Sequence, residues 1–126
     1  MIIGVGIDLV SIPRIEGALK RWGDNFKKRI FSPVEIAYSE THANSGQHFA
    51  ASFAVKEAFF KAMINGSKPY RVRMLDIEVV RDREGRPHIN VYGGAKQAVE
   101  QIGIKSMHTS ISHDGEYSVA IVILER

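Results

Sequence analysis

The sequence contains no cysteine among its 126 residues. This absence excludes disulfide bonds, thiolate zinc sites and cysteine nucleophiles, and it is typical of proteins in a reducing cytosol. No apolar run approaches the roughly 20 residues that a membrane-spanning helix needs. The first residues lack the basic segment of a signal peptide. We therefore expect a cytoplasmic protein without a membrane partner.

Signatures of nucleotide and nucleic-acid binding are also missing. The stretch Gly4-Val5-Gly6 lacks the third glycine and the following helix of a dinucleotide fingerprint. The 17 basic residues exceed the 14 acidic ones, giving a net charge of +3 and a pI near 9.3, which favours an anionic partner. Basic motifs interleaved with aromatic residues are absent, so we expect no nucleic-acid partner.

The composition is that of an ordinary globular protein, with 44% apolar and 25% charged residues. Its length fits one compact domain that buries roughly two-thirds of its unfolded surface and so needs no covalent cross-links. The sequence shows no internal repeat, low-complexity tract or linker. We therefore predict a single domain over residues 1–126.

Hydrophobic periodicity predicts helices early in the chain and antiparallel strands late. Four helices are expected, the first capped by Ser11 and the others over 33–43, 47–64 and 95–102. Five strands are expected over 2–10, 75–80, 88–92, 106–112 and 117–124. The sum is an α+β domain whose helices pack on a mainly antiparallel sheet, which a largely buried first strand joins. Asp8 is expected near the exit of that strand.

The helix expected over 47–64 carries the first candidate for chemistry. Three phenylalanines share one face of it and are expected in the core: Phe49, Phe53 and Phe60. Glu57 and Lys61 fall on a neighbouring line, and their ordinary interpretation is a solvated i,i+4 pair worth about 0.3 to 0.5 kcal/mol. The alternative is a ligand site at the margin of the core, because an unpaired acid in so apolar a helix is unusual. Asn65-Gly66 predicts the end of the helix.

Asp8 is the second candidate, as either a cap or a ligand held on a rigid edge. If Asp8 and Glu57 meet, two carboxylates from different elements suit a hard cation such as Mg²⁺, which takes phosphate oxygens as further ligands. Lys61, one turn beyond Glu57, would then add positive charge beside the same phosphate.

A row of polar side chains is the third candidate. On a strand, His108, Ser110 and Ser112 share one face. They form either an anion-binding row or a solvent-facing polar surface. A Ser-His-Asp triad is not expected there, because adjacent residues on a strand point to opposite faces and triads assemble from separated segments.

A basic stripe is the fourth candidate. Arg14, Arg21 and Lys28 recur every seven residues in the first helix, beside its apolar face. All of the formal excess of +3 arises in residues 1–30, which hold six basic and three acidic side chains. The stripe is either a solvated charged face or a surface on which an acidic partner helix lies.

Several stretches, in this order and spacing, resemble the holo-acyl-carrier-protein synthase family of 4′-phosphopantetheinyl transferases. The main ones are Gly6-Ile7-Asp8, the run from Phe53 to Ala62 with Lys56-Glu57-Ala58 at its centre, and the run from His108 to His113. Further likenesses are Arg29 to Glu35, Asp76 to Val79 and Gly85-Arg86-Pro87, so the resemblance spans nearly the whole chain. Two departures are Asn65-Gly66-Ser67, where the family usually has a Gly-Thr-Gly-like turn, and Ala18, where a bulkier apolar residue is common.

The resemblance implies an enzyme that moves the phosphopantetheine arm of coenzyme A to a serine hydroxyl of an acyl carrier protein, releasing adenosine 3′,5′-bisphosphate. It implies that Asp8 and Glu57 hold Mg²⁺ and that Lys61 contacts phosphate. The general base stays open between Asp8 and a water held by Glu57. A non-catalytic trimeric module that binds nucleotide or carrier protein is the alternative.

The resemblance also implies a homotrimer with active sites at subunit boundaries. His108, Ser110 and the Gly85-Arg86-Pro87 turn of a neighbouring copy are then expected to contact the adenosine 3′-phosphate. Because carrier proteins are acidic and helical, the Arg14, Arg21 and Lys28 stripe becomes the expected docking surface for the carrier.

Overall fold

The computed structural model describes residues 1–63 and 70–126. In these ranges the elements follow in the order β1 (Ile2–Ser11), α1 (Ile12–Ile30), α2 (Pro33–Glu40), α3 (Ser45–Ala62), the 3-10 helix η1 (Met74–Asp76), β2 (Ile77–Arg81), β3 (Pro87–Val91), α4 (Gly93–Ile102), β4 (Ser106–Asp114) and β5 (Tyr117–Glu125). Helices and antiparallel strands form the predicted α+β architecture.

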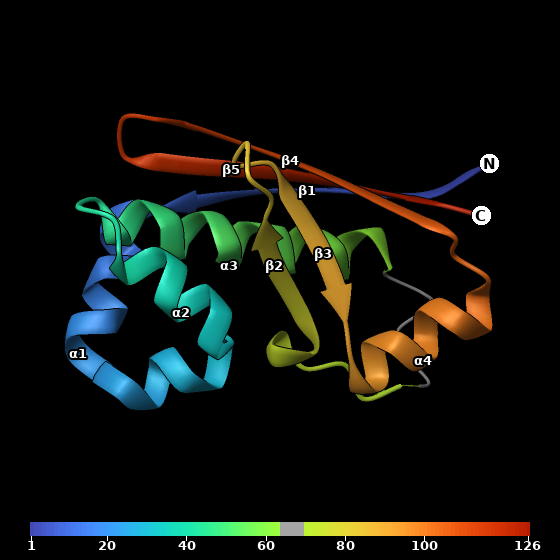
Figure 1. Ribbon diagram of the computed structural model, residues 1–126, viewed down its shortest axis with the longest axis horizontal. Helices are drawn as coiled ribbons and strands as arrows, with labels where there is room; N and C mark the ends of the chain where they lie inside the picture. Colours follow the sequence, from blue (N-terminus) through green and yellow to red (C-terminus); the bar gives the residue numbers. More distant parts are fainter. Residues whose placement is uncertain (64–69) are drawn as a thin grey trace.

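The strands form two antiparallel sheets rather than the single sheet expected (Figure 1). The larger sheet has the order β1-β5-β4, so the first strand pairs with the last, as predicted, and Asp8 lies opposite Ala120. The helix α3 packs against this sheet, and the β2–β3 hairpin crosses over α3. The hairpin stands apart because its buried side chains, among them Ile77 and Val79, join the core around α3 instead of extending a sheet edge.

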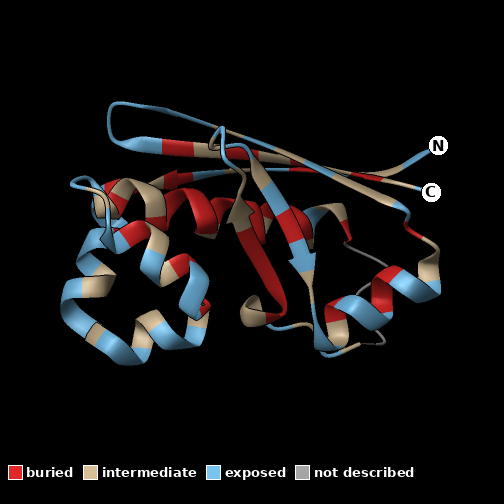
Figure 2. Ribbon diagram, viewed as in Figure 1, coloured by how far each residue is buried: buried red, intermediate tan, exposed pale blue. Residues whose placement is uncertain are grey.

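Side chains of α3 and β5 form the centre of the core (Figure 2). Every second residue of β5 is buried, as strand alternation requires: Ser118, Ala120, Val122 and Leu124. On α3, the small residues Ala50, Ala54 and Ala58 are fully buried. Because these side chains are short, the sheet comes close to the axis of α3.

β1 and α3 touch through backbone atoms at two glycines. A Cβ atom placed on Gly6 would lie 1.8 Å from the carbonyl oxygen of Ala58, and one placed on Gly4 would lie 2.1 Å from that of Ala62. Such distances are far inside van der Waals contact, so only glycine permits this approach. β1 therefore lies directly on the second half of α3, and Asp8 follows two residues after Gly6.

The expectation of a largely buried first strand is wrong. Ile2, Val5, Ile7 and Leu9 of β1 are 55% to 64% exposed, because they point away from α3 and no described element covers the outer face of the sheet. Asp8 lies within β1, three residues before its end and so near the exit of the strand, as expected.

Several predicted boundaries of the helices shift. The helix expected over 33–43 ends at Glu40, and α3 begins at Ser45, two residues earlier than expected, after Asn44, whose side chain makes no capping hydrogen bond. Phe49 is buried as expected, but Phe53 and Phe60 are half-buried. The predicted stop at Asn65-Gly66 lies outside the described residues, as does the departure at Asn65-Gly66-Ser67. No described helix combines the length and hydropathy needed to cross a membrane.

Substituting Gly6 tests the close contact of β1 with α3. We expect Gly6→Ala to lower the free energy of unfolding by about 1 to 3 kcal/mol or more, because the new methyl group forces the strand off the helix. The measurement is urea denaturation followed by circular dichroism. Gly17→Ala in α1 is the matched control: its Cβ would meet nothing within 4 Å, and we expect a gain of about 0.5 to 1 kcal/mol. Equal stability of both variants would contradict the proposed contact.

Candidate active site

Asp8 and Glu57 line one cleft of about 420 Å³ between β1, α1 and α3. Asp8 comes from β1 and Glu57 from α3, and the glycine contact described above brings these two segments together. Arg14 and Phe26 of α1 and Phe53 of α3 lie along the same cleft. Two acids that are 49 positions apart in the sequence therefore face a common space.

Lys61 binds Asp8 rather than forming the expected pair with Glu57. Its Nζ donates to Asp8 Oδ1 at 2.9 Å and to the backbone oxygen of Ile7 at 2.9 Å. The Asp8 side chain is 16% exposed and that of Lys61 is 53% exposed, so the ammonium group remains reachable from solvent. The interpretation as a helical i,i+4 pair with Glu57 is therefore wrong. The ion-pair partner of Lys61 is Asp8, which β1 brings beside the helix.

The Glu57 carboxyl lies in a setting that disfavours negative charge. The pKa of Glu57 lies above its ordinary value, first because of burial and second because of the negative charge of Asp8, while Lys61 partly offsets both. Within the described residues, no hydrogen bond or ion pair to its carboxylate occurs, and no cluster of three or more potential metal-ligating side chains forms. A cation placed between the two acids would relieve their mutual repulsion.

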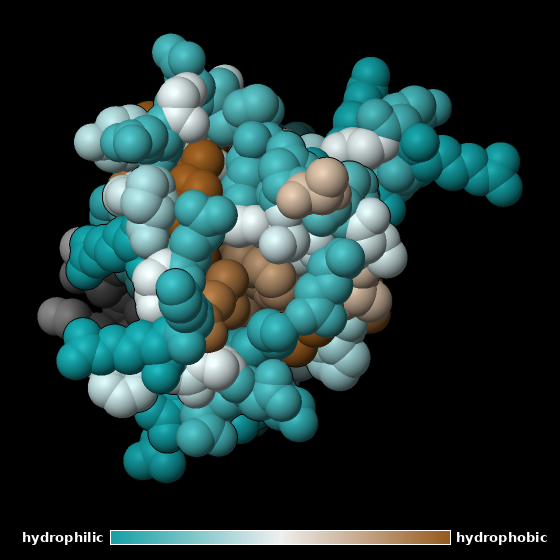
Figure 3. All heavy atoms as spheres, turned by 90° about the vertical axis from the view of Figure 1, so that its left-hand side faces the viewer, coloured by the Kyte–Doolittle hydropathy of each residue, from teal (hydrophilic) through white to brown (hydrophobic). Residues whose placement is uncertain are grey.

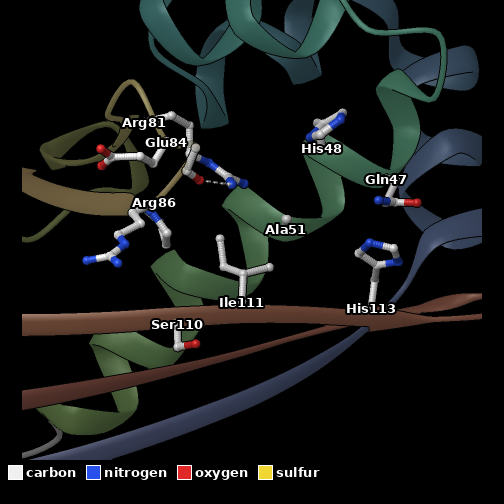
Figure 4. Close-up of a pocket in the computed structure, with 11 residues that line it drawn as sticks. Gln47, His48, Ala51, Arg81, Glu84, Arg86, Ser110, Ile111 and His113 are labelled. Atoms are coloured by element: carbon white, nitrogen blue, oxygen red, sulfur yellow. Dashed lines mark hydrogen bonds between the residues drawn. The ribbon is translucent and has the colours of Figure 1, made fainter.

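A second cleft, of about 350 Å³, opens between α3, the β2–β3 turn and β4. Four predicted site residues line it: Gly85, Arg86, Pro87 and Ser110. Sequence reasoning missed several further lining residues: Gln47, His48, Arg81, Glu84 and His113. Figure 4 shows Ile111 and His113 projecting from β4 toward α3, whereas Ser110 projects from the opposite face of the strand.

The turn that borders this second cleft is held by side-chain hydrogen bonds. Asp82 Oδ1 accepts from the backbone N–H groups of Glu84 and Arg86, each at 2.9 Å. Gly85 has a φ of 83°, which favours glycine. Arg81 Nη1 donates to the Gly85 oxygen at 3.1 Å (Figure 4). These contacts fix the backbone of the turn and the guanidinium of Arg81.

His108 does not line the second cleft with Ser110. Its Nε2 lies 2.5 Å from Glu125 Oε1 on the exposed face of β4. His108, Ser110 and Ser112 do share that face, as strand alternation predicted. Within a single chain, His108, Ser110 and Ser112 therefore form a solvent-facing polar surface rather than an anion-binding row. Of these three residues, Ser110 lines the edge of the second cleft.

The basic stripe on α1 is interrupted by a kink. Gly23 has φ 59° and ψ −139°, so Arg14 and Arg21 precede the kink and Lys28 follows it. The seven-residue spacing assumed one regular helix, and the stripe is therefore not continuous. Figure 3 faces this end of the molecule and shows apolar side chains gathered between hydrophilic ones. A third cleft, lined by Trp22, Asn25, Phe26 and Arg29, lies there.

Sequence reasoning also missed a buried ion pair next to Glu57. Lys56 Nζ lies 2.9 Å from Glu35 Oε1, and both side chains are fully buried. The same ammonium group donates to the backbone oxygens of Met74 and Ile77. Burial lowers the pKa of Lys56, and the negative charge of Glu35 opposes this effect. The pair joins α3 to α2, and the same ammonium group joins α3 to the start of β2. The sequence signal that could have indicated this pair is a lysine among the apolar residues of the helix.

Comparison with known proteins identifies the family. The family model described as ACPS: 4′-phosphopantetheinyl transferase superfamily matches residues 4–122. The chain belongs to this superfamily. It is 45% identical over 125 residues to the holo-[acyl-carrier-protein] synthase of Koribacter versatilis, covering 99% of each chain. The predicted family and enzyme class are thereby confirmed.

Solved structures of transferases in this superfamily share the fold. The holo-[acyl-carrier-protein] synthase of Neisseria meningitidis superposes with a TM-score of 0.87 at 31% identity, covering 100% of each chain. The Helicobacter pylori enzyme, solved in complex with coenzyme A, gives a TM-score of 0.80 at 33% identity, covering 96% of this chain and 99% of that one. The α+β fold of this transferase is therefore that of its family.

Removing the charge of Asp8 tests the coupling within the first cleft of this transferase. We expect Asp8→Asn to lower the pKa of Glu57, because a repelling charge disappears and Lys61 loses its carboxylate partner. The measurement is an NMR titration of side-chain carboxyl groups without divalent cations. Asp24→Asn, at an exposed position of α1, is the control and should leave Glu57 unchanged. A Glu57 pKa that stays constant in Asp8→Asn would refute the coupling.

Proposed function

We propose that the protein transfers the 4′-phosphopantetheine group of coenzyme A to a serine hydroxyl of apo acyl carrier protein. The reaction depends on Mg²⁺ and releases adenosine 3′,5′-bisphosphate, and residues 1–126 act as one transferase domain. The observation that carries the proposal is that Asp8 and Glu57 line one cleft and that Lys61 binds Asp8, in a chain of this superfamily. The names of its relatives, and the coenzyme A bound by the Helicobacter pylori enzyme, support the choice of substrates.

The residues of the first cleft fit a magnesium ion. Asp8 and Glu57 offer hard carboxylate oxygens, and Glu57 is held where added positive charge is favourable. Mg²⁺ is commonly bound by one or two carboxylates, with water and substrate phosphate as its other ligands. Asp8 and Glu57 would hold the ion, and when bound it would neutralise negative charge on the diphosphate.

Lys61, Asp8 and Glu57 have different roles in the proposed transfer. The serine oxygen bonds to the phosphorus that carries the pantetheine arm, and the bridging oxygen leaves with adenosine 3′,5′-bisphosphate. Lys61, half-exposed beside Asp8, places positive charge near that leaving oxygen. The serine proton passes to Asp8 or to a water held by Glu57. Positioning and charge neutralisation supply most of the catalysis in such reactions.

A homotrimer accounts for two features of the single chain. The outer face of β1 leaves four large apolar side chains exposed, which is typical of a surface that another protein covers. The two clefts lie at opposite edges of the larger sheet, one beside β1 and one beside β4. We infer that His108, Ser110 and the Gly85-Arg86-Pro87 turn of a neighbouring copy contact the adenosine 3′-phosphate of coenzyme A bound at Asp8 and Glu57.

The carrier protein is proposed to dock on α1. Arg14 lines the first cleft, so an acidic helix beside it would present a serine near Asp8 and Glu57. The guanidinium of Arg21 lies 5.2 Å from the ring centre of the exposed Trp22, which adds an apolar contact to the charge. Lys28 follows the Gly23 kink and would contact a different part of the carrier.

Removing either acid tests the proposed reaction. We expect Asp8→Asn and Glu57→Gln each to lower kcat by roughly 100-fold or more while the fold is retained, because each loses charge at the diphosphate. The assay incubates protein, coenzyme A, Mg²⁺ and apo carrier protein, and mass spectrometry follows the gain of mass on the carrier. Omission of Mg²⁺ should abolish the gain. A folded wild-type protein that binds coenzyme A but forms no product would support the non-catalytic alternative instead.

Charge reversal on α1 tests carrier docking. We expect Arg21→Glu to raise KM for the carrier about tenfold at low salt, and less at high salt, because the interaction is electrostatic and screened. The value of kcat should change little. Lys96→Glu is the matched control, since Lys96 is exposed on α4 at the opposite end of the molecule (Figure 1). Equal KM values for the two variants would exclude α1 as the docking surface.

A further inference from the structure

Lys56 makes three buried hydrogen-bonding contacts, one residue away from Glu57. Its Nζ lies 2.9 Å from Glu35 Oε1 and donates to the backbone oxygen of Met74 at 2.9 Å and to that of Ile77. A lysine ammonium group has three N–H donors, so each donor here has one acceptor. The acceptors come from α2, η1 and β2, and the side chains of both charged residues are fully buried. The ammonium group therefore joins α3 to three other elements at one point.

Glu35 is fixed by bonds that do not depend on Lys56. Its Oε1 accepts from the N–H of Ser32 at 2.7 Å, and its Oε2 accepts from the N–H of Val79 at 2.8 Å. The first bond belongs to the capping box of α2, and the second attaches the carboxylate to β2. Charge-assisted hydrogen bonds to a fixed acceptor are directional, whereas apolar packing is not. The carboxylate therefore gives α3 a directional anchor.

Glu57 lies between two fixed points of α3. On one side Lys56 is attached to α2 and β2, and on the other the carbonyl oxygen of Ala58 lies where Gly6 of β1 contacts the helix. Successive residues are about 100° apart around a helix axis, so the anchor of Lys56 sets the direction in which Glu57 enters the first cleft. Among the described residues, those that line this cleft do not include Lys56 or Glu35. Any effect of the pair on the cleft must therefore pass through α3.

A small rotation of α3 is enough to misplace the Glu57 carboxylate. Side-chain atoms lie about 5 to 6 Å from a helix axis, so a rotation of about 10° moves them by about 1 Å. A displacement of this size in a reacting site can lower the rate by about 100-fold. An anchor that fixes the rotation of α3 therefore has control over the first cleft from a distance.

We propose that the buried pair of Lys56 and Glu35 positions Glu57, by setting the rotation of α3 that directs its carboxylate into the first cleft. Resting on the proposed function, this gives the pair a part in the transfer without contact with either substrate. Stability alone does not account for the pair, because apolar residues of similar volume are often as stabilising as a buried ion pair. Lys56 and Glu35 are therefore positioning residues.

The double variant Glu35→Gln/Lys56→Met tests the proposal without leaving one buried charge unpaired. Glutamine also completes a capping box, and methionine fills space without donating a hydrogen bond. We expect the variant to fold, as checked by circular dichroism and urea denaturation, because a buried ion pair can be replaced by uncharged side chains of similar size. Ile104→Ala is the control for a loss of stability alone, since Ile104 is a buried core residue that follows α4.

Binding of Mg²⁺ is measured first, without coenzyme A or carrier protein. The backbone amide shifts of Asp8 and Glu57 in two-dimensional NMR spectra give the half-saturating Mg²⁺ concentration of each protein. We expect this concentration to rise about fivefold or more in the double variant, because the two carboxylates no longer converge on one ion. In Ile104→Ala it should stay at the wild-type value.

Steady-state kinetics supplies the second measurement. At saturating Mg²⁺ we expect kcat of the double variant to fall by about 10-fold to 100-fold, while KM for the carrier stays at the wild-type value. Glu35→Asp is a milder variant that keeps both charges and shortens the acceptor by one methylene. It should change kcat and the half-saturating Mg²⁺ concentration in the same directions by smaller factors, and it tests the proposal if the double variant does not fold.

The possible results separate this proposal from the proposed function. A folded double variant whose Mg²⁺ binding and kcat match those of Ile104→Ala overturns the positioning role and leaves the transferase function intact. A rise in KM for the carrier as large as the loss of kcat also overturns it, because the fold is then loosened in general. A wild type without Mg²⁺-dependent shifts at Glu57 overturns it too, since no cation is bound there. The expected Mg²⁺ binding in a protein that never modifies the carrier overturns the transferase function and supports the positioning role.

Discussion

The contact between β1 and α3 determines where the reactive groups lie. At Gly4 and Gly6 the strand backbone rests on the carbonyl oxygens of Ala62 and Ala58, closer than any side chain would allow. Asp8 comes two residues after this contact, and its carboxylate therefore reaches Lys61 while facing the cleft that Glu57 also lines. A strand held one side chain further away would separate the two acids, which would weaken their electrostatic coupling and their ability to share one cation.

Charge is distributed differently in the two clefts, and each distribution suits a different part of one anionic substrate. The first cleft places two acids beside Lys61, which suits a diphosphate only when a cation is added. The second cleft is lined by Arg81 and Arg86 together with Glu84, a basic excess that suits an anionic group without a metal. The clefts lie at opposite edges of the β1-β5-β4 sheet, so the proposed function needs a second copy of the chain to bring both clefts to one ligand.

The sequence predicted most elements because their signals are local. Hydrophobic period, the capping box at Ser32 and Glu35, and the left-handed Gly103 that ends α4 each act over a few residues. The exposed outer face of β1 was missed, since its apolar residues give the same sequence pattern as a strand that is buried on both faces. The ion pair of Lys61 with Asp8 was missed because helical spacing predicts only which residues of the same helix are neighbours. Asp8 belongs to a strand, and its position beside Lys61 depends on how that strand packs on the helix. His48 and His113 of the second cleft come from segments far apart in the sequence, so no spacing pattern predicts that they lie in the same cleft.

α3 carries residues that line both clefts, so the elements packed around it must keep its orientation fixed. His48 and Glu57 are nine residues apart, which is about 13 Å along a helix axis, so any tilt of α3 against its surroundings would displace both groups. The buried pair of Lys56 and Glu35 opposes such a tilt, because it ties α3 to α2, while the same ammonium group binds the backbone where β2 begins. Glu35 also accepts from the N–H of Val79 at 2.8 Å. A buried pair is costly to desolvate and is weak grounds for stability by itself. Its place in the fold gives it another role, since Lys56 links the helix that bears Glu57 to the hairpin that bears the basic turn.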